Sequence, residues 1–206
     1  MHTEVASPAT RNRPRTEARL CEAVGTVLIK GGFAALTPSA VAEAAGVDKM
    51  LIYRYFGGME GLMVAFANGP DLFPSFEEVC GGDPSAIRAM PLSRRGGLII
   101  DNYARLLIAR PLALELMVWE LVERNALTAI TETARETMGL RIGREIFDDV
   151  EDPAQISAIS AVLAAGVTYL AIRQRKIRWF NGIDLKSDQG WAQIRAAIAV
   201  MTAGLG

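Results

Sequence analysis

One short stretch of the sequence concentrates side chains suited to contacting nucleic acid. Residues 49–56 read KMLIYRYF and hold a lysine, an arginine and two tyrosines. If the stretch is helical, Ile52 and Phe56 share a face at i and i+4 and point inward with Val47. The other side chains then lie outside, where cationic and tyrosine groups suit phosphates and base edges. The alternative is a small three-helix core in which the aromatic side chains only pack.

The residues before this stretch predict two short helices joined by a tight turn. Thr37 is a good N-cap and Pro38 occupies a tolerated first-turn position, so a helix should begin there. Gly46 supplies a left-handed residue that ends it. Asp48 then caps a second helix that runs to about Phe56. Two such helices form a helix-turn-helix, which lays its second helix in the DNA major groove.

The same residues resemble the DNA-binding domain of the TetR (tetracycline-repressor-like) family over roughly the first 65 residues. The family's first helix and turn appear here as Thr37, Val41, Ala42, Ala45, Gly46 and Val47. Its second helix, and the acidic start of the next, appear as Ile52, Tyr53, Arg54, Tyr55, Phe56 and Glu60, with Leu62 or Met63 following. The resemblance implies a DNA-binding function for this end of the chain.

Two positions depart from the family pattern. Met59 stands where the family usually has a lysine that grips a phosphate at a helix start. Asp48 stands where a small or hydroxyl residue is common, and its charge would repel phosphate unless the side chain stays on the helix cap. The expected DNA-binding residues are Thr37, Ser39, Lys49, Met50, Leu51, Tyr53, Arg54 and Tyr55. Of these, we expect Thr37 and Tyr55 to hold phosphates.

Composition predicts a larger helical body behind this motif. The 206 residues can bury a sizeable core, and the chain is half hydrophobic with few aromatics, which favours packed helices over sheets. The net charge of −1 excludes a generally basic nucleic-acid coat, although residues 1–56 carry +2. Residues 1–14 form a basic tail with Arg11 and Arg13, either solvated or lying along DNA.

Catalytic and metal chemistry have few candidate residues. The single histidine, His2, lies in the tail, so histidine-based triads and metal clusters are not expected in the folded body. We therefore expect no enzyme activity and no cofactor. A helical enzyme would need perturbed carboxylates in the region 101–123. With only Cys21 and Cys80 and no secretory signal at the start, we expect a cytoplasmic protein.

Helical periodicity divides the chain into an expected DNA-binding domain at 15–68 and a helical ligand-binding and dimerisation domain at 69–206. The first domain begins with a helix at 16–30 and ends with a helix at 58–68, and residues 69–84 form a proline-containing connection laid on the body. No strand alternation persists, so the expected fold is all-α. The later helices are expected at 92–109, from 111 to about 125, from there to about 150, at 153–172 and from 188, the last one capped by Ser187.

Residues 153–172 form a run of 20 residues without a charge, followed by several basic residues. Such a run could cross a membrane. Its glutamine, serines and threonine dilute the hydrophobicity, and a helix buried in a core and a subunit interface together fits better. The resemblance implies a homodimer through a four-helix bundle, here 153–174 and 188–204, with no membrane contact. A membrane-associated helical protein is the rival.

The resemblance also implies a small-molecule pocket between the central helices. The candidate ligand-binding residues are Tyr103, Met117, Trp119, Glu120, Glu123, Met138 and Phe147, with ordinary core and surface positions as the alternative for each. The expected function is a ligand-responsive regulator, a repressor that binds a near-palindromic DNA operator as a dimer and is released by a small-molecule effector. The alternative is an activator or architectural protein of the same fold without an inducer.

Overall fold

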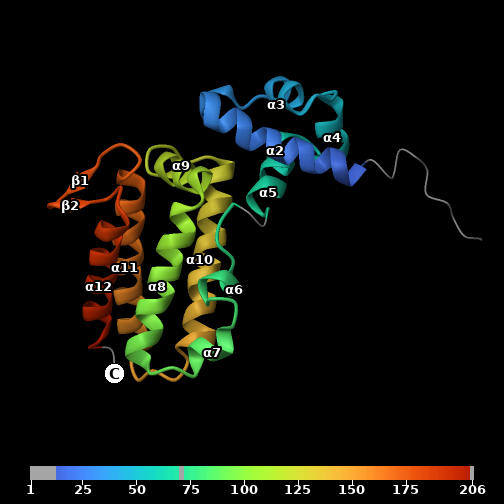
Figure 1. Ribbon diagram of the computed structural model, residues 1–206. Helices are drawn as coiled ribbons and strands as arrows, with labels where there is room; N and C mark the ends of the chain where they lie inside the picture. The colour runs from blue at the N-terminus through green and yellow to red at the C-terminus, as the bar shows by residue number, and fades with distance from the viewer. Residues whose placement is uncertain (1–12, 70–71, 205–206) are drawn as a thin grey trace, which may run out of the picture. The chain divides into compact units, whose positions relative to one another are not determined.

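The protein is helical, as the composition predicted. A computed structural model describes residues 13–69 and 72–204, and these form helices joined by short turns with one small hairpin (Figure 1). The chain divides into two compact units. The first comprises residues 1–69 and 124–131, and the second comprises 70–123 and 132–206.

The first unit is built on one long helix. Its elements are α2 (Arg13–Gly31), η1 (Phe33–Ala35), α3 (Pro38–Ala45), α4 (Met50–Phe56) and α5 (Met59–Ala67), with residues 124–131 added. Leu20, Ile52 and Leu62 are fully buried and bring α2, α4 and α5 into one core. Helix α2 begins earlier than the expected Thr16, so Arg13 is helical and not part of a tail. The rest of the expected tail, residues 1–12, lies outside the described residues.

The second unit is organised around α8. Its elements are α6 (Phe76–Val79), α7 (Pro84–Arg88), α8 (Leu92–Ile108), α9 (Pro111–Glu120), most of α10 (Ala126–Ile146), α11 (Pro153–Arg173), β1 (Trp179–Phe180), β2 (Ile183–Asp184) and α12 (Asp188–Thr202). Helices α11 and α12 both pack on α8 (Figure 1). As the sequence predicted, Ser187 caps α12, its hydroxyl accepting a hydrogen bond from the amide of Gly190 at 3.0 Å.

Several small elements were not expected, among them α6 and the hairpin. Helix α6 lies inside the predicted connection 69–84, closed by a capping box of Ser75 and Glu78. The β1–β2 hairpin turns at Asn181 and Gly182, both at positive φ. An Asn-Gly pair favours such a turn, but each strand has only two residues, too few for an alternating pattern to show.

A buried arginine holds the start of α8 against the end of α10. Arg95 is only 7% exposed, and its guanidinium donates to the two carboxylate oxygens of Asp149 at 2.6 and 2.9 Å. It also donates to the carbonyls of Met90 and Ile146, at 2.8 and 2.9 Å. The hydrogen bonding of Arg95 to the Asp149 carboxylate is the largest influence that lowers the pKa of Asp149. The clamp fixes the end of α10 that borders the cavity described below.

Candidate nucleic-acid interface and effector cavity

The turn between α3 and α4 has the geometry that its sequence predicted. The Thr37 hydroxyl accepts a hydrogen bond from the amide of Ala40 at 3.2 Å, which caps α3. Gly46 is left-handed, with φ of 62°, and ends that helix. The amide of Val47 then donates to the carbonyl of Ala42 at 3.0 Å. Local side chains therefore fix the direction in which α4 leaves the turn.

Asp48 is engaged at the start of α4. Its carboxylate accepts a hydrogen bond from the amide of Met50 at 2.7 Å, although the N-cap position itself falls on Lys49, one residue later than expected. The charge that would repel phosphate thus satisfies a free amide at the helix start.

Arg19 is a positioning residue that the sequence did not reveal. It lies on α2, and its guanidinium donates to the carbonyl of Ala45 and, at 3.3 Å, to that of Gly46. It thereby ties the long helix to the turn of the helix-turn-helix. No local pattern marks this contact, because its partners are backbone atoms 26 and 27 residues away.

A second hidden constraint joins α4 to α5. A Cβ atom built on Gly61 would lie 1.9 Å from the carbonyl oxygen of Phe56, so only glycine allows the two backbones to approach this closely. Ile52 is fully buried as predicted, while Val47 and Phe56 are half-buried. Val64 on α5 is 37% exposed.

Helix α4 presents a mixed polar and aromatic surface to solvent. Tyr53 and Met50 are 49% and 60% exposed, and six of the predicted contact residues are exposed: Thr37, Ser39, Lys49, Met50, Tyr53 and Arg54. Leu51 and Tyr55 are half-buried. The guanidinium of Arg13 lies over the ring of Tyr55, 5.1 Å from its centroid, and brings the start of α2 to this surface.

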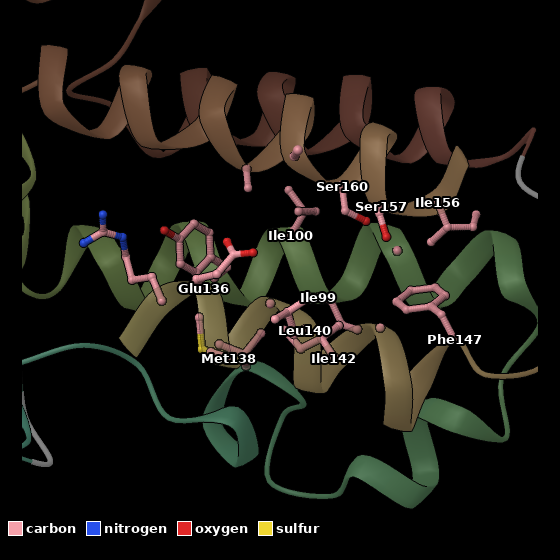
Figure 2. A pocket seen from close by; sticks show the side chains of 18 of the residues that line it. Ile99, Ile100, Glu136, Met138, Leu140, Ile142, Phe147, Ile156, Ser157 and Ser160 are labelled. Carbon is pink, nitrogen blue, oxygen red and sulfur yellow. The ribbon is translucent and has the colours of Figure 1, made fainter. Parts of the chain in front are cut away.

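The second unit contains a cavity of about 920 Å³ walled mainly by α8, α10 and α11. Figure 2 shows Ile156, Ser157 and Ser160 reaching into it from α11, with Ile99 and Ile100 from α8 and Phe147, the residue after α10, on the other sides. Most of the lining is apolar or small, with a few polar groups. This size and composition suit a small organic molecule.

The cavity includes some of the predicted ligand-binding residues and leaves out others. Tyr103, Met117, Met138 and Phe147 line it. The other three predicted residues, Trp119, Glu120 and Glu123, are not among the lining residues.

The geometry of α9 explains why these three lie elsewhere. Its buried face carries Leu114 and Met117, and Trp119, two residues further on, points to a different side of the helix. The Glu120 carboxylate is bound by Arg135, and Glu123 lies exposed beyond the helix end.

The polar residues of the cavity come mostly from α10 and α11. The Tyr103 hydroxyl lies 3.4 Å from that of Thr168, and burial raises the pKa of Tyr103. The charged lining residues are Glu132, Arg135, Glu136, Arg144 and Asp148. Sequence reasoning missed them because α10 carries charges around much of its circumference, which gives no clear inward face.

Comparison with known proteins finds a sequence match in the first unit and solved structures similar to both units. Residues 23–66 match the sequence model of the bacterial regulatory proteins of the tetR family. No curated protein matches the chain. A TetR-like transcriptional regulator from Rhodococcus sp. RHA1 has 15% identity and a TM-score of 0.63, over 92% of this chain and 96% of that one.

Two further solved structures share this fold over nearly their full lengths. The fatty acid degradation regulator FadR from Bacillus halodurans has 18% identity and a TM-score of 0.60, over 98% of this chain and 97% of that one. A TetR-family regulator from Streptomyces coelicolor has 16% identity and a TM-score of 0.52, over 98% and 99%. At these identities the likeness establishes the fold of the whole chain.

Proposed function

We propose that this chain, a member of the non-enzymatic TetR family of DNA-binding transcriptional regulators, acts in the cytoplasm as a homodimeric repressor. The dimer would cover a near-palindromic operator and leave when a small molecule fills the cavity. The observation that carries this proposal is the exposed surface of α4, set by the capped turn before it. An activator or architectural role without an inducer is the alternative.

The α4 surface supports a division of DNA contacts. Lys49, Tyr53 and Arg54 project from the helix and are exposed, so in this proposal they meet base edges in the major groove, together with Leu51. Thr37 and Tyr55 lie at the flanks and would hold phosphates. Arg13, stacked on Tyr55, adds a cation beside that phosphate position.

The exposure of α11 supports a second copy of the chain as a partner. By length and composition this helix is long and apolar enough to cross a membrane. Only 22% of its most apolar 18-residue stretch is buried within the chain. Val162 and Tyr169 on α11 are 72% and 49% exposed, and Val200 and Met201 on α12 are 76% and 56% exposed. Contact through 153–174 and 188–204 of two copies would cover this apolar surface.

The proposed release works through a difference in affinity. A ligand shifts the protein off DNA only if it binds the released form more tightly, by roughly 100-fold or about 3 kcal/mol. Helix α10 begins in residues that belong to the first unit and continues along the cavity of the second. In this proposal, a ligand that displaces α10 is therefore linked to the DNA-binding unit through one continuous helix.

The decisive experiment is selection of bound DNA from a random library with the purified protein. We expect enrichment of a near-palindrome whose half-sites lie about one helical turn apart, or a multiple of that. Recovery of no preferred sequence would contradict sequence-specific regulation. Sedimentation with the selected DNA measures whether the protein binds as a dimer. Protein that instead partitions with membranes would contradict the proposed function. The footprint position relative to the promoter separates repression from activation.

A further inference from the structure

We propose that Asp48 determines one base of each operator half-site: its carboxylate accepts a hydrogen bond from the N4 amine of a cytosine in the major groove. The premise is the proposed entry of α4 into that groove. The new element is a base preference that the DNA contacts proposed above do not assign. Three features of Asp48 support it: the charge of its surroundings, its place in the helix-turn-helix and the orientation of its carboxylate.

Asp48 is an acidic residue on a surface that otherwise suits a polyanion. It is exposed, and it is the only acidic residue in the sequence between Glu43 and Glu60. The neighbouring Lys49 and, further along the same helix, Arg54 are exposed cations. Phosphate contacts supply much of the affinity of proteins for DNA, and a carboxylate beside a phosphate is repelled. Asp48 therefore lowers the affinity for DNA unless a donor group of the DNA faces it.

The place of Asp48 in the chain brings it to the base edges. It directly precedes Lys49, the N-cap of α4, and Met50, the first residue of that helix. In a helix-turn-helix, the N-terminal residues of the second helix contact base edges, while the first helix crosses the DNA backbone. In the proposed complex, Asp48 therefore approaches bases and not only phosphates.

The carboxylate has one oxygen engaged and one available. Oδ1 accepts a hydrogen bond from the amide of Met50 at 2.7 Å, and the main-chain carbonyl of Asp48 accepts one from the amide of Leu51 at 3.0 Å. Among the described residues, none donates a hydrogen bond to Oδ2 or forms an ion pair with it. Because the helix start already fixes the direction of the carboxylate, little side-chain freedom is lost when Oδ2 accepts a hydrogen bond from DNA.

The major groove offers two kinds of donor to such an oxygen. They are the N4 amine of cytosine and the N6 amine of adenine, whereas guanine and thymine present acceptors there. Adenine also presents the acceptor N7 beside its amine, and this nitrogen repels a carboxylate. Cytosine presents the amine without that neighbour. An acidic residue at the start of α4 therefore favours cytosine and disfavours the other three bases.

The first test changes the second oxygen and keeps the first. Asn and Ser can both accept the hydrogen bond from the amide of Met50, so Asp48→Asn and Asp48→Ser should unfold in urea close to the native protein. In the selection from a random library, we expect the native protein to prefer cytosine at one position of each half-site. Asp48→Ser should lose that preference, by about tenfold in affinity. Asp48→Asn presents an amide NH2 in place of Oδ2, so it should favour guanine or thymine there.

Glu43→Gln is the matched control. Glu43 lies on α3 in the same unit, is exposed and makes no side-chain hydrogen bond or ion pair within the described chain. Its substitution removes the same charge as Asp48→Asn, so both variants should bind random DNA more tightly, by up to about fivefold. Only Asp48→Asn should change a base preference. The same change in Glu43→Gln would assign the effect to overall charge and overturn the inference.

A second test leaves the protein unchanged. N4-methylcytosine still pairs with guanine, but its methyl group replaces the amine hydrogen that faces the major groove. Placed at the selected cytosine, it should weaken binding of the native protein by about tenfold and leave binding of Asp48→Ser within about twofold. Native binding that ignores the methyl group, or equal weakening of both proteins, would overturn the contact between Asp48 and the amine.

The outcomes for base preference and for DNA binding as a whole are distinguishable. If the native protein selects no DNA sequence, the regulator proposal falls and the base contact falls with it. If it selects a near-palindrome and both Asp48 variants keep the same base preferences, the regulator proposal stands and Asp48 serves only to hold the start of α4.

Discussion

The two units of this protein leave different kinds of side chain uncovered. In the first, α4 buries Ile52 and exposes Tyr53 and Arg54, which carry hydrogen-bonding groups. In the second, α11 exposes Val162 and Tyr169 along a helix with very few polar residues. A charged, hydrogen-bonding surface suits a polyanion, whereas an uncovered apolar helix suits another protein surface. The two proposed interfaces, one for DNA and one for a second copy of the chain, therefore have opposite chemistry.

Two helical glycines, one in each unit, lie in opposite surroundings. Gly61 permits the close approach of α5 to the end of α4. Gly139 lies in a helix beside an open cavity, where an added Cβ would meet nothing. Gly61 therefore holds a packed geometry, while Gly139 lies beside empty space.

The largest expected effect comes from testing this contrast with one substitution at two sites. Gly61→Ala should destabilise the first unit by about 3 kcal/mol or more, because the backbones of α4 and α5 must separate, and should abolish DNA binding. Gly139→Ala should stabilise the second unit by about 0.5–1 kcal/mol through helix propensity. Urea unfolding and operator affinity measure both. A Gly61→Ala variant with native stability would mean that α5 does not pack against α4 in this way.

The next effect tests the apolar interface. Val162→Arg should reduce dimer affinity by roughly 3 kcal/mol or more, since each copy would bring a new charge into the proposed apolar interface. Monomer stability should change little, because the side chain is exposed. Val122→Arg is the matched control at a valine 80% exposed outside α11 and α12. Sedimentation equilibrium that shows equally strong dimers for both variants would place the interface elsewhere.

A smaller effect is expected at the DNA-binding surface. Arg54→Ala should reduce affinity for the operator by about 1–3 kcal/mol and relax the preference at one base position, if the guanidinium contacts a base edge. Tyr55→Phe should weaken all sequences alike, by about 1 kcal/mol, through loss of one phosphate hydrogen bond. Binding to operator and random DNA distinguishes the two. A uniform loss in Arg54→Ala would reassign that residue to the phosphate backbone.

The sequence predicted those features of the fold that depend on neighbouring residues. Thr37, Gly46 and Ser187 cap or end helices through contacts within a few positions, so their types and spacing were sufficient. Arg19 and Gly61 act on backbone atoms brought near by folding, and no local pattern marks them.

The cavity was harder to predict for the same reason. The choice of Trp119 and Glu120 rested on residue type alone, and only the packing of α9 shows that they lie off the lining. The charged lining residues could not be found because a charge on a helix indicates a solvated surface until the neighbouring helices are placed. Helix caps and turns that depend on local spacing could therefore be predicted from the sequence, whereas cavity-lining residues that depend on helix packing could not.

The smallest expected effect concerns Met59, at the edge of the proposed DNA-binding surface. Met59 is the half-buried first residue of α5. It follows Gly58, which has no side chain to cap the helix. Free amides at a helix start attract phosphate, and a lysine there adds one cation. Met59→Lys should therefore tighten binding to all DNA sequences and make its salt dependence steeper by about one released counterion.

Met63→Lys supplies the control for that prediction. It places the same charge on the same helix, also at a half-buried methionine, but one turn beyond the helix start. Operator affinity measured over a series of salt concentrations should show a steeper slope for Met59→Lys and an unchanged slope for Met63→Lys. If the two variants show the same salt dependence, the added charge acts only through the overall electrostatic field of the first unit. If Met59→Lys binds no more tightly than the native protein, the start of α5 does not face the DNA backbone, and the phosphate contacts are confined to α3, α4 and the stacked Arg13.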